Sequence, residues 1–501
     1  MNDRILKASM ALGAIVSLAG AESTTEGNMK TLLFFDDEAL NQRQNIVRRI
    51  GRAERIEESV FADPSGGNAA WGYPFVWRDT TSGKWRMIYQ AGHYKNTYRD
   101  CGGGVVMLAE SADGLRWQAV DTTAAVKLPD RVTINQVLPM TKGVGLLSGG
   151  YEDTRAEPDR RLKLMRVVCG AAPNGSELWT SADGLSWRLE EGVHWQTQAP
   201  DPPTFAHFNA LRGRYVLSSR PDNGQRQIVL FETDDWRTFT PPEELVMTAD
   251  SLDRPLTQIY GMPIFPYEGW YIGLVWLFHC PASERRHFPH IYLGGRSDVQ
   301  VAYSRNGWHW QRGPREPLLP NGANGAPDAG CLQASSMVRL EDGSLRIYAC
   351  TSRHEHGQIH SGDGYIVAYA LRQDGFVCLQ SDGGPGWVGT RALYWRGGEA
   401  RLNVQARGGW ARVQVTDPRG RTLDGYSFDA CAKFDGDRAD WTPEWKDGCT
   451  LAALAGRPVR LEIELYNASL YALRGDFVVL NTEQVKKFNE KGIIPGDRPG
   501  F

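Results

Sequence analysis

The sequence lacks an excess of charge of either sign. It has 56 Lys and Arg against 59 Asp and Glu among 501 residues, so the formal net charge is −3. Lys and Arg form no long runs, so the chain lacks the clustered cations that neutralise nucleic-acid phosphates. Beyond the N-terminal residues, no segment is long and apolar enough to cross a membrane. We therefore expect neither a nucleic-acid partner nor a membrane span.

Cysteine is also scarce. The eight cysteines include no Cys-X-X-Cys pair and no spacing typical of zinc ligands. Eight in 501 residues are too few for a disulfide scaffold. Cys431 and Cys449 could pair if the chain is exported, and buried free thiols are at least as favoured for the others. The cysteines thus predict no metal centre and leave the compartment open.

The N-terminal residues have the pattern of an export signal. Arg4 and Lys7 precede a mildly apolar stretch at 8–20, and Ala19-Gly20-Ala21 offers small residues for cleavage. We expect residues 1–28 to be a signal peptide and the protein to be periplasmic or extracellular. Translation from Met29 would instead leave it in the cytoplasm.

Glycine and aromatic residues are abundant, with 55 Gly, 17 Trp, 18 Tyr and 17 Phe, which indicates many short strands. A short marker recurs five times, each time after a strand-like run. Four of the five contain an Asp-Gly or Asn-Gly pair, which suits a tight turn, and the aromatic residue that follows packs between sheets. Thr233–Phe239, which has Asp-Trp instead, and Arg372–Phe376 are the weaker relatives. The markers are Ser111–Trp117, Ser181–Trp187, Thr233–Phe239, Ser304–Trp310 and Arg372–Phe376.

Each marker falls between the third and fourth strand of a four-stranded repeat. Five such repeats predict an all-β fold, a five-bladed β-propeller over residues 30–386. In the second repeat, 134–140 and 145–150 compete for the inner strand. In the fifth repeat, the outer strand is expected from Phe376 onward.

The pattern changes after Trp387. Runs such as Val459–Leu465 alternate strictly between apolar and polar residues, as half-buried antiparallel strands do. We predict a C-terminal β-sandwich at 387–478 and a tail at 479–501 with a short helix at 482–490. A structural role is favoured for the sandwich over glycan binding, because its tryptophans (Trp395, Trp410, Trp441 and Trp445) are scattered.

Propeller topology sorts the charged residues by face. Asp79, Asp153 and Glu268 fall in hairpins on the marker face, and we expect them to be structural. The opposite face, the funnel, should gather residues that precede inner strands or follow second strands. The candidate catalytic residues there are Asp63, Asp201, Asp253 and Asp328. The candidate substrate-binding residues are Trp71, Tyr73, Gln90, His93, Arg220, Tyr260, His279, Arg353 and His354.

The markers, Asp201-Pro-Pro-Thr, Ile259–Glu268 and Asp328-Ala-Gly resemble motifs of the five-bladed propeller glycosidases of families 32 and 43. The chain is especially similar to bacterial family-32-like propellers with an appended β-sandwich. The resemblance implies a glycoside hydrolase that uses three carboxylates. It casts Asp63 as nucleophile or base and Asp201 as the residue that tunes the acid. No glutamate stands where the acid is expected; Glu284 and Glu355 are nearest, and Asp253 or Asp328 could replace it.

Other functions stay open at this point. A non-catalytic carbohydrate-binding propeller would explain the missing glutamate. A sialidase would need three arginines in the funnel, and a uronate lyase would need His with Arg or a metal. Arg353–His360 holds three histidines and a glutamate but has no known metal spacing, so we predict no metal site there. Calcium on the propeller axis is compatible with the sequence. We expect a carbohydrate substrate and leave the oligomeric state open.

Overall fold

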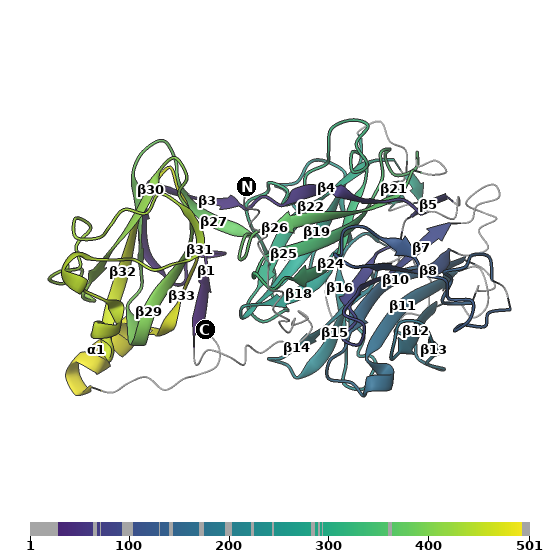
Figure 1. Cartoon of the computed structure of the whole chain (residues 1–501), viewed down its shortest axis with the longest axis horizontal. Helices are drawn as coiled ribbons and strands as arrows, with labels where there is room; N and C mark the ends of the chain where they lie inside the picture. Colours follow the sequence, from purple (N-terminus) through teal and green to yellow (C-terminus); the bar gives the residue numbers. More distant parts are fainter. Residues whose placement is uncertain are drawn as a thin grey trace, which may run out of the picture.

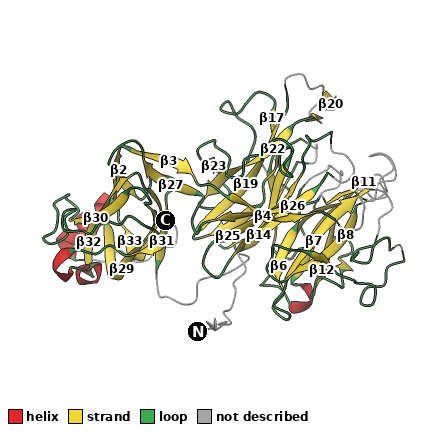
Figure 2. Cartoon of the chain, turned by 45° about the horizontal axis from the view of Figure 1, so that its top comes forward, coloured by secondary structure: helices red, strands yellow, loops and turns green. Residues whose placement is uncertain are grey.

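A computed structural model describes most of the chain, and almost all of its regular structure is β-strand (Figure 2). A propeller and a smaller sandwich lie side by side (Figure 1). Within the described residues, no helix is long and apolar enough to span a membrane. The described residues are 29–63, 68–70, 72–92, 104–129, 131–139, 144–169, 175–195, 203–221, 225–242, 245–281, 286–288, 291–292, 294–358 and 363–492.

Five separate antiparallel sheets form the blades of the propeller, which confirms the predicted fold class. Blade 1 contains β5 (Asn68–Ala70), β6 (Phe75–Arg78), β7 (Trp85–Gly92), β8 (Val105–Ser111) and β9 (Gln118–Ala119). Blade 2 contains β10 (Val144–Glu152), β11 (Leu162–Cys169), β12 (Gly175–Ser181) and β13 (Arg188–Leu189). Blade 3 contains β14 (Phe205–Asn209), β15 (Arg214–Ser219) and β16 (Val229–Thr233). Blade 4 contains β17 (Thr257–Gly261), β18 (Ile264–Tyr267), β19 (Trp270–His279), β22 (Arg296–Ser304) and β23 (Gln311–Arg312). Blade 5 contains β24 (Leu332–Arg339), β25 (Leu345–Thr351), β26 (Tyr365–Leu371) and β4 (Glu54–Phe61).

The sheets settle one open point of the strand assignment and correct one prediction, the fourth strand of the third repeat. The inner strand of blade 2 is β10, which pairs with β11, so the 145–150 candidate is the right one. Blade 3 has no regular fourth strand among the described residues. Its outer edge is instead held by the isolated bridges Ile228–Met247 and Glu232–Thr240.

The ring is closed by the N-terminal part of the chain. β4 is the outer strand of blade 5, where it pairs with β26. The predicted outer strand from Phe376 onward was wrong, because β27 (Val377–Ser381) pairs with β3 (Ile46–Ile50) and β33 (Ser469–Val479). A groove of about 510 Å³ marks the closure seam between β4 and the outer edge of blade 1.

The sandwich likewise combines both ends of the chain. Its first layer pairs β1 (Lys30–Leu33), β3, β27, β29 (Leu393–Gln405), β31 (Asp437–Trp441) and β33. Its second layer pairs β2 (Leu40–Gln44), β28 (Gly386–Thr390), β32 (Arg457–Tyr466) and β30 (Trp410–Thr416). The sheets therefore do not follow the predicted boundary at 386/387: residues 30–50 and 377–386 contribute strands to the sandwich rather than to the propeller.

The short terminal helix is present as α1 (Thr482–Lys491). Asn481 caps it by accepting from the Gln484 amide, while the Gln484 side chain bonds back to the Asn481 amide. This reciprocal capping box satisfies two amides that a helix start otherwise leaves unpaired. Gly492 ends the helix in the left-handed conformation, with φ of 60°.

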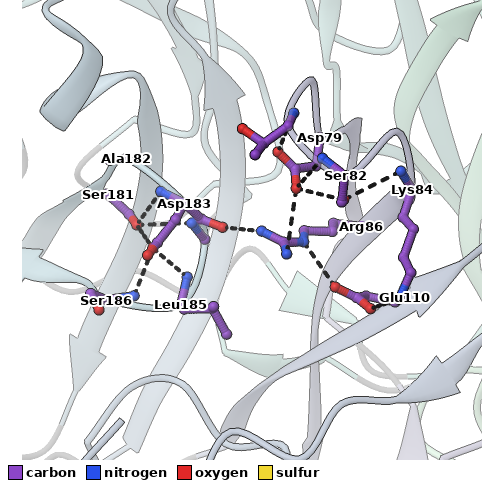
Figure 3. A network of polar contacts seen from close by, with 12 residues as sticks. Asp79, Ser82, Lys84, Arg86, Glu110, Ser181, Ala182, Asp183, Leu185 and Ser186 are labelled. Carbon is purple, nitrogen blue, oxygen red and sulfur yellow. Dashed lines mark hydrogen bonds and ion pairs between the residues drawn. The ribbon is translucent and has the colours of Figure 1, made fainter. Parts of the chain in front are cut away.

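The marker turns join neighbouring blades. In blade 2, Asp183 accepts from the amides of Leu185 and Ser186, and its own carbonyl accepts from Arg86 of blade 1 at 2.7 Å (Figure 3). Gly184 has φ of 76° and lies against Trp77 of blade 1, so a side chain would collide there. The marker of blade 1 repeats the contact with blade 5 through Arg346.

Acidic residues of the marker-face hairpins are structural, as predicted. Asp79 accepts from the hydroxyl of Ser82 at 2.7 Å and pairs with Arg86 (Figure 3). Asp153, which is fully buried, pairs with Lys163 at 2.7 Å. Glu268 pairs with Arg339 at 2.9 Å.

The two domains meet at the marker face of blades 4 and 5. Phe34 lies in the core of the sandwich, and the next residue, Phe35, packs in the core shared by blades 4 and 5. The ring of Phe35 lies 5.0 Å from that of Tyr303 and 5.1 Å from that of Trp270. The sandwich therefore docks on the side of the propeller opposite the funnel.

Candidate funnel site

The centre of the propeller is closed by aromatic rings. Trp276 is fully buried, and its indole nitrogen donates to the Ala334 carbonyl of the inner strand of blade 5 at 2.8 Å. Its ring lies 5.0 Å from Tyr73 of blade 1 and 5.4 Å from Phe205 of blade 3. A Cβ on Gly261 would lie 2.7 Å from the indole, so this glycine leaves room for the ring. Tyr73 is half-buried. It belongs to an aromatic cluster that also contacts blades 3, 4 and 5.

Asp253 is held by arginines at the outer edge of blade 4. Arg312 of β23 donates to both its oxygens at 2.6 and 2.7 Å, and also donates to Gln300 of the third strand. Burial alone would raise the pKa of Asp253, but hydrogen bonds from Arg312 and the Asp250 amide lower it below its ordinary value. A carboxyl group with a lowered pKa is a poor general acid at neutral pH.

Asp328 has the equivalent place in blade 5. Arg55 of β4 donates to it at 2.8 Å and the Tyr369 hydroxyl of β26 donates at 2.7 Å. Its side chain is only 3% exposed. The structure therefore places Asp253 and Asp328 against the outer strands of two different blades, where each is bound to an arginine.

The length of the linker before each inner strand explains why these two residues do not converge on the propeller axis as expected. Asp253 and Asp328 each lie four positions before an inner strand, β17 and β24. Four extended residues span about 13 Å, and adjacent strands lie about 4.8 Å apart. A residue at this position can therefore reach the outer half of a blade while its chain is still crossing toward the centre.

Of the two remaining linker aspartates, Asp63 differs from this pair. Asp63 is half-buried and accepts from the Tyr89 hydroxyl of the second strand at 3.2 Å, which lies further inward. Burial raises the pKa of Tyr89, and the charge of Asp63 raises it further, so this tyrosine stays a neutral donor. Asp201 also lies four positions before its inner strand, β14, but falls outside the described residues.

Gln90 is a structural link rather than an exposed binding group. It is 1% exposed, and its side-chain oxygen accepts from the Leu147 amide of the inner strand of blade 2 at 2.5 Å. The predicted role in substrate binding is wrong for this residue, because its side chain is buried between blades 1 and 2.

Two predicted residues, Arg220 of blade 3 and Tyr260 of the inner strand of blade 4, do come together. Arg220 follows β15, and its guanidinium donates to the Tyr260 carbonyl at 3.0 and 3.1 Å. It also lies 4.3 Å from the centre of the Tyr260 ring. Arg226 lies 4.6 Å from the same ring and donates to Gln258 at 2.8 Å.

Blade 5 completes this group with His356. Its Nε2 lies 3.2 Å from the Tyr260 hydroxyl, within hydrogen-bond distance. The imidazole also packs edge-on to Phe278 at 5.4 Å. We call Arg220, Arg226, Tyr260, Phe278 and His356 the tyrosine cluster. It joins three blades, carries two cations, and holds a tyrosine and a histidine that can exchange a proton.

His279 lies on the other face of blade 4. It follows Phe278 in β19, so the two side chains point to opposite faces of the sheet. Its Nε2 lies 2.9 Å from Asp298, and its Nδ1 lies 3.3 Å from the Thr257 hydroxyl. The histidine and the aspartate are each about one-sixth exposed, with side-chain exposures of 18% and 17%.

In the Arg353–His360 segment, three side chains each contact a different partner. His354 Nδ1 lies 2.6 Å from Asp363, which also accepts from the Arg353 amide at 2.9 Å. Arg353 covers the Tyr365 ring at 4.8 Å. Glu355 is paired with Arg296 at 3.0 Å, so it is neutralised as Asp253 is.

Several predicted residues lie outside the described residues: Trp71, His93, Asp201 and Glu284. Among the described residues, no group of three His, Cys, Asp or Glu could hold a metal ion. Cys431 and Cys449 are both free thiols.

Sequence analysis did not single out Arg226, Asp298 or Asp363. Each lies at the funnel end of a second or third strand, the place already used for Arg220 and His279. Extending that rule from second strands to the residues before third strands would have included them.

The chain is similar in structure to known proteins, but no protein family matches its sequence. No family model and no curated protein matches the chain, so the resemblance to families 32 and 43 rests on its motifs. A glycosyl hydrolase from Bacteroides ovatus is similar at 11% identity and a TM-score of 0.41, covering 65% of this chain and 94% of that one. An N-acetylgalactosamine deacetylase from F. plautii is similar at 13% and 0.43, with 65% and 95% covered. A beta-1,2-mannobiose phosphorylase from Listeria innocua is similar at 12% and 0.40, with 66% and 97% covered. TM-scores below 0.5 carry no argument about activity.

Proposed function

We propose that this protein is a carbohydrate-active enzyme that cleaves glycosidic bonds at the funnel end of blades 3, 4 and 5. One observation carries the proposal: Tyr260 is contacted by Arg220 from blade 3 and by His356 from blade 5. Sugar sites hold a few convergent polar groups, which the tyrosine cluster provides. Its arginines and Tyr260 are at most 5% exposed, and the half-buried His356 is the member that solvent reaches. Its arginines suit hydroxyl or carboxylate groups of a sugar.

Hydrolysis is the reaction we propose first. It requires a carboxylate as nucleophile or base and a second group as proton donor. Asp63 is the proposed carboxylate, because it contacts the Tyr89 hydroxyl of a second strand, nearer the axis, whereas Asp253 and Asp328 lie against arginines of the outer strands. Asp201 is the proposed partner that tunes the acid.

Elimination from a uronic acid is the second candidate, and the tyrosine cluster favours it specifically. In such a reaction a base removes a proton beside the carboxylate, and the sugar–oxygen bond then breaks to leave a carbon–carbon double bond. Tyr260 and His356 are the candidate proton-transfer groups. Arg220 and Arg226 are the candidate partners of the uronate charge.

Product analysis with the full chain tests both reactions. Neutral and uronate-containing polysaccharides would be assayed for new reducing ends and for the ultraviolet absorbance of an unsaturated product. We expect Tyr260→Phe to lower elimination at least a hundredfold, because it removes the proposed proton-transfer hydroxyl. Asp63→Asn should abolish hydrolysis but spare elimination.

His309→Ala is the matched control, because this exposed histidine lies in the marker turn of blade 4 on the opposite face. It should leave turnover unchanged. Turnover that survives both Tyr260→Phe and Asp63→Asn would exclude this site. Saturable binding without any turnover would establish the carbohydrate-binding alternative.

A further inference from the structure

The second layer of the sandwich presents a flat outward face. Strands β2, β28, β32 and β30 lie next to one another in that order. Buried and accessible residues alternate along β30 and β32, so Val413 and Ile463 point into the core, and Val388 of β28 is buried with them. Their neighbours Trp387, Arg412 and Glu464 share the outward face, because they are register partners across three strands.

Aromatic rings lie on this face where solvent can reach them. Trp410 and Tyr466 are direct cross-strand partners, with ring centroids 5.9 Å apart and planes inclined by 28°. Tyr466 is 41% exposed, the one aromatic among the large apolar side chains that the described part of the chain exposes. Trp395, Trp441 and Trp445 are buried in the same domain, so the outward aromatics are not part of its core.

Hydrogen-bonding side chains surround these rings. Arg412 donates to Glu464 at 2.5 Å, and Gln414 donates to Glu462 at 2.6 Å. The Trp387 indole donates to Gln44 at 3.2 Å. We call the outward face the aromatic platform. It consists of Gln44, Trp387, Trp410, Arg412, Gln414, Glu462, Glu464 and Tyr466.

The platform holds one cation, Arg412, and two carboxylates, of which Glu462 is bonded to the neutral Gln414. Arg412 pairs with both Glu464 and Asp429, and the Lys433 ammonium lies 4.0 Å from the centre of the Trp410 ring. A polyanion or an anionic membrane needs a field of unpaired cations, which this face does not present. A neutral partner rich in hydroxyl groups fits better, because side-chain amides and carboxylates can accept and donate to it.

We propose that the aromatic platform binds a neutral polysaccharide chain, separately from the funnel. The apolar faces of successive sugar rings stack on Tyr466 and Trp387, and Trp410, which lies beside Tyr466 and under the Lys433 ammonium, supports the Tyr466 ring. The sugar hydroxyl groups bond to the paired Gln and Glu side chains between the rings. The sandwich docks on the marker face of the propeller, so a chain bound here does not compete with a substrate in the funnel.

Affinity electrophoresis of the full chain tests this site. Native gels would contain galactomannan, arabinoxylan or hydroxyethyl cellulose, and a gel with polygalacturonate would serve as the acidic contrast. We expect at least one neutral gel to retard the protein. The double substitution Trp410→Ala and Tyr466→Ala should lower the apparent affinity at least tenfold, whereas Trp410→Phe should retain part of it.

The controls separate binding from folding and from the funnel. Leu252→Ala removes an apolar side chain that is 73% exposed on the propeller and should leave retardation unchanged. Tyr260→Phe should also be retarded like the native protein, so failure of the funnel proposal leaves this one testable. Circular dichroism and thermal unfolding must show each variant folded.

Three binding results would overturn the proposal. These are no retardation in any neutral gel, retardation by polygalacturonate alone, or equal retardation of the native protein and the double variant. A native dimer that the double variant converts to monomers would also overturn it, because the platform would then be an interface between two copies.

Discussion

His207 shows how burial without partners fixes the charge of a single residue. It lies in β14, is 1% exposed, and neither ring nitrogen has a hydrogen-bond partner among the described residues. Its nearest ring neighbour is Tyr271 at 5.5 Å. Desolvation lowers the pKa of His207 to about 3, because nothing nearby stabilises the imidazolium. The residue therefore stays neutral between blades 3 and 4.

This neutrality predicts a pH dependence of stability. Above about pH 6.5 the imidazole is neutral in the folded and in the unfolded chain. Below that pH the unfolded chain binds a proton, whereas the folded chain does not. Stability should therefore fall as the pH drops from about 6.5 toward 3, by up to about 1.4 kcal/mol per pH unit from this group. His207→Phe should remove that component, measured by urea unfolding at pH 7, 5.5 and 4.5. His309→Phe is the exposed control, and an unchanged slope in His207→Phe would contradict the assignment.

At the scale of the element, β4 does more than complete a sheet. It brings Arg55 to Asp328, and so binds the linker that leads into the inner strand of the same blade. Blade 4 repeats the arrangement with Arg312 and Asp253, using its own outer strand. The arginine of the outermost strand thus fixes the segment that enters the blade, and this is a structural use of aspartates at positions that resemble catalytic ones.

The ion pair of blade 5 can be tested by a double-mutant cycle. Arg55→Met should cost about 3–5 kcal/mol, because it leaves the carboxylate of Asp328 buried without its cation. The double variant Arg55→Met with Asp328→Asn should recover part of that loss, measured by urea unfolding at pH 7. Additive losses from the two single substitutions would show that the pair is not coupled.

At the scale of the whole molecule, residues 30–61 belong to both domains, since β1 to β3 lie in the sandwich and β4 lies in the propeller. The fifth marker strengthens the junction. Asp374 is 1% exposed and accepts from Tyr267 of blade 4 at 2.9 Å and from Arg474 of β33 at 2.5 Å. Asn403 of β29 donates to its other oxygen at 3.0 Å. We therefore expect the two domains to unfold together.

Replacing Phe35 tests this coupling. The ring is 1% exposed and packs on Trp270, Tyr303 and Phe376, so Phe35→Ala should cost about 3–5 kcal/mol at the junction. Differential scanning calorimetry should show one transition for the native protein and two for the variant. A single transition at the native midpoint in Phe35→Ala would mean that the junction contributes little.

Local patterns in the sequence determined the all-β class, the five repeats, the marker turns and α1. Each depends on residues a few positions apart: a turn needs Asp-Gly or Asn-Gly, a half-buried strand needs alternation, and the helix needs Asn481 with Gln484. The sequence also predicted that Arg220 and Tyr260 lie at the funnel, because strand direction alone fixes which end of a blade a residue occupies.

Only the tertiary structure decided which strand closes the ring and where the linker aspartates end. β4 pairs with β26, which lies some 300 residues away, and no local pattern distinguishes it from a strand after Phe376. Asp253 and Asp328 precede inner strands as predicted, yet their side chains reach arginines of the outer strands. Spacing fixes how far a linker can extend, whereas the position of its charge depends on the partner that the folded sheets bring to it.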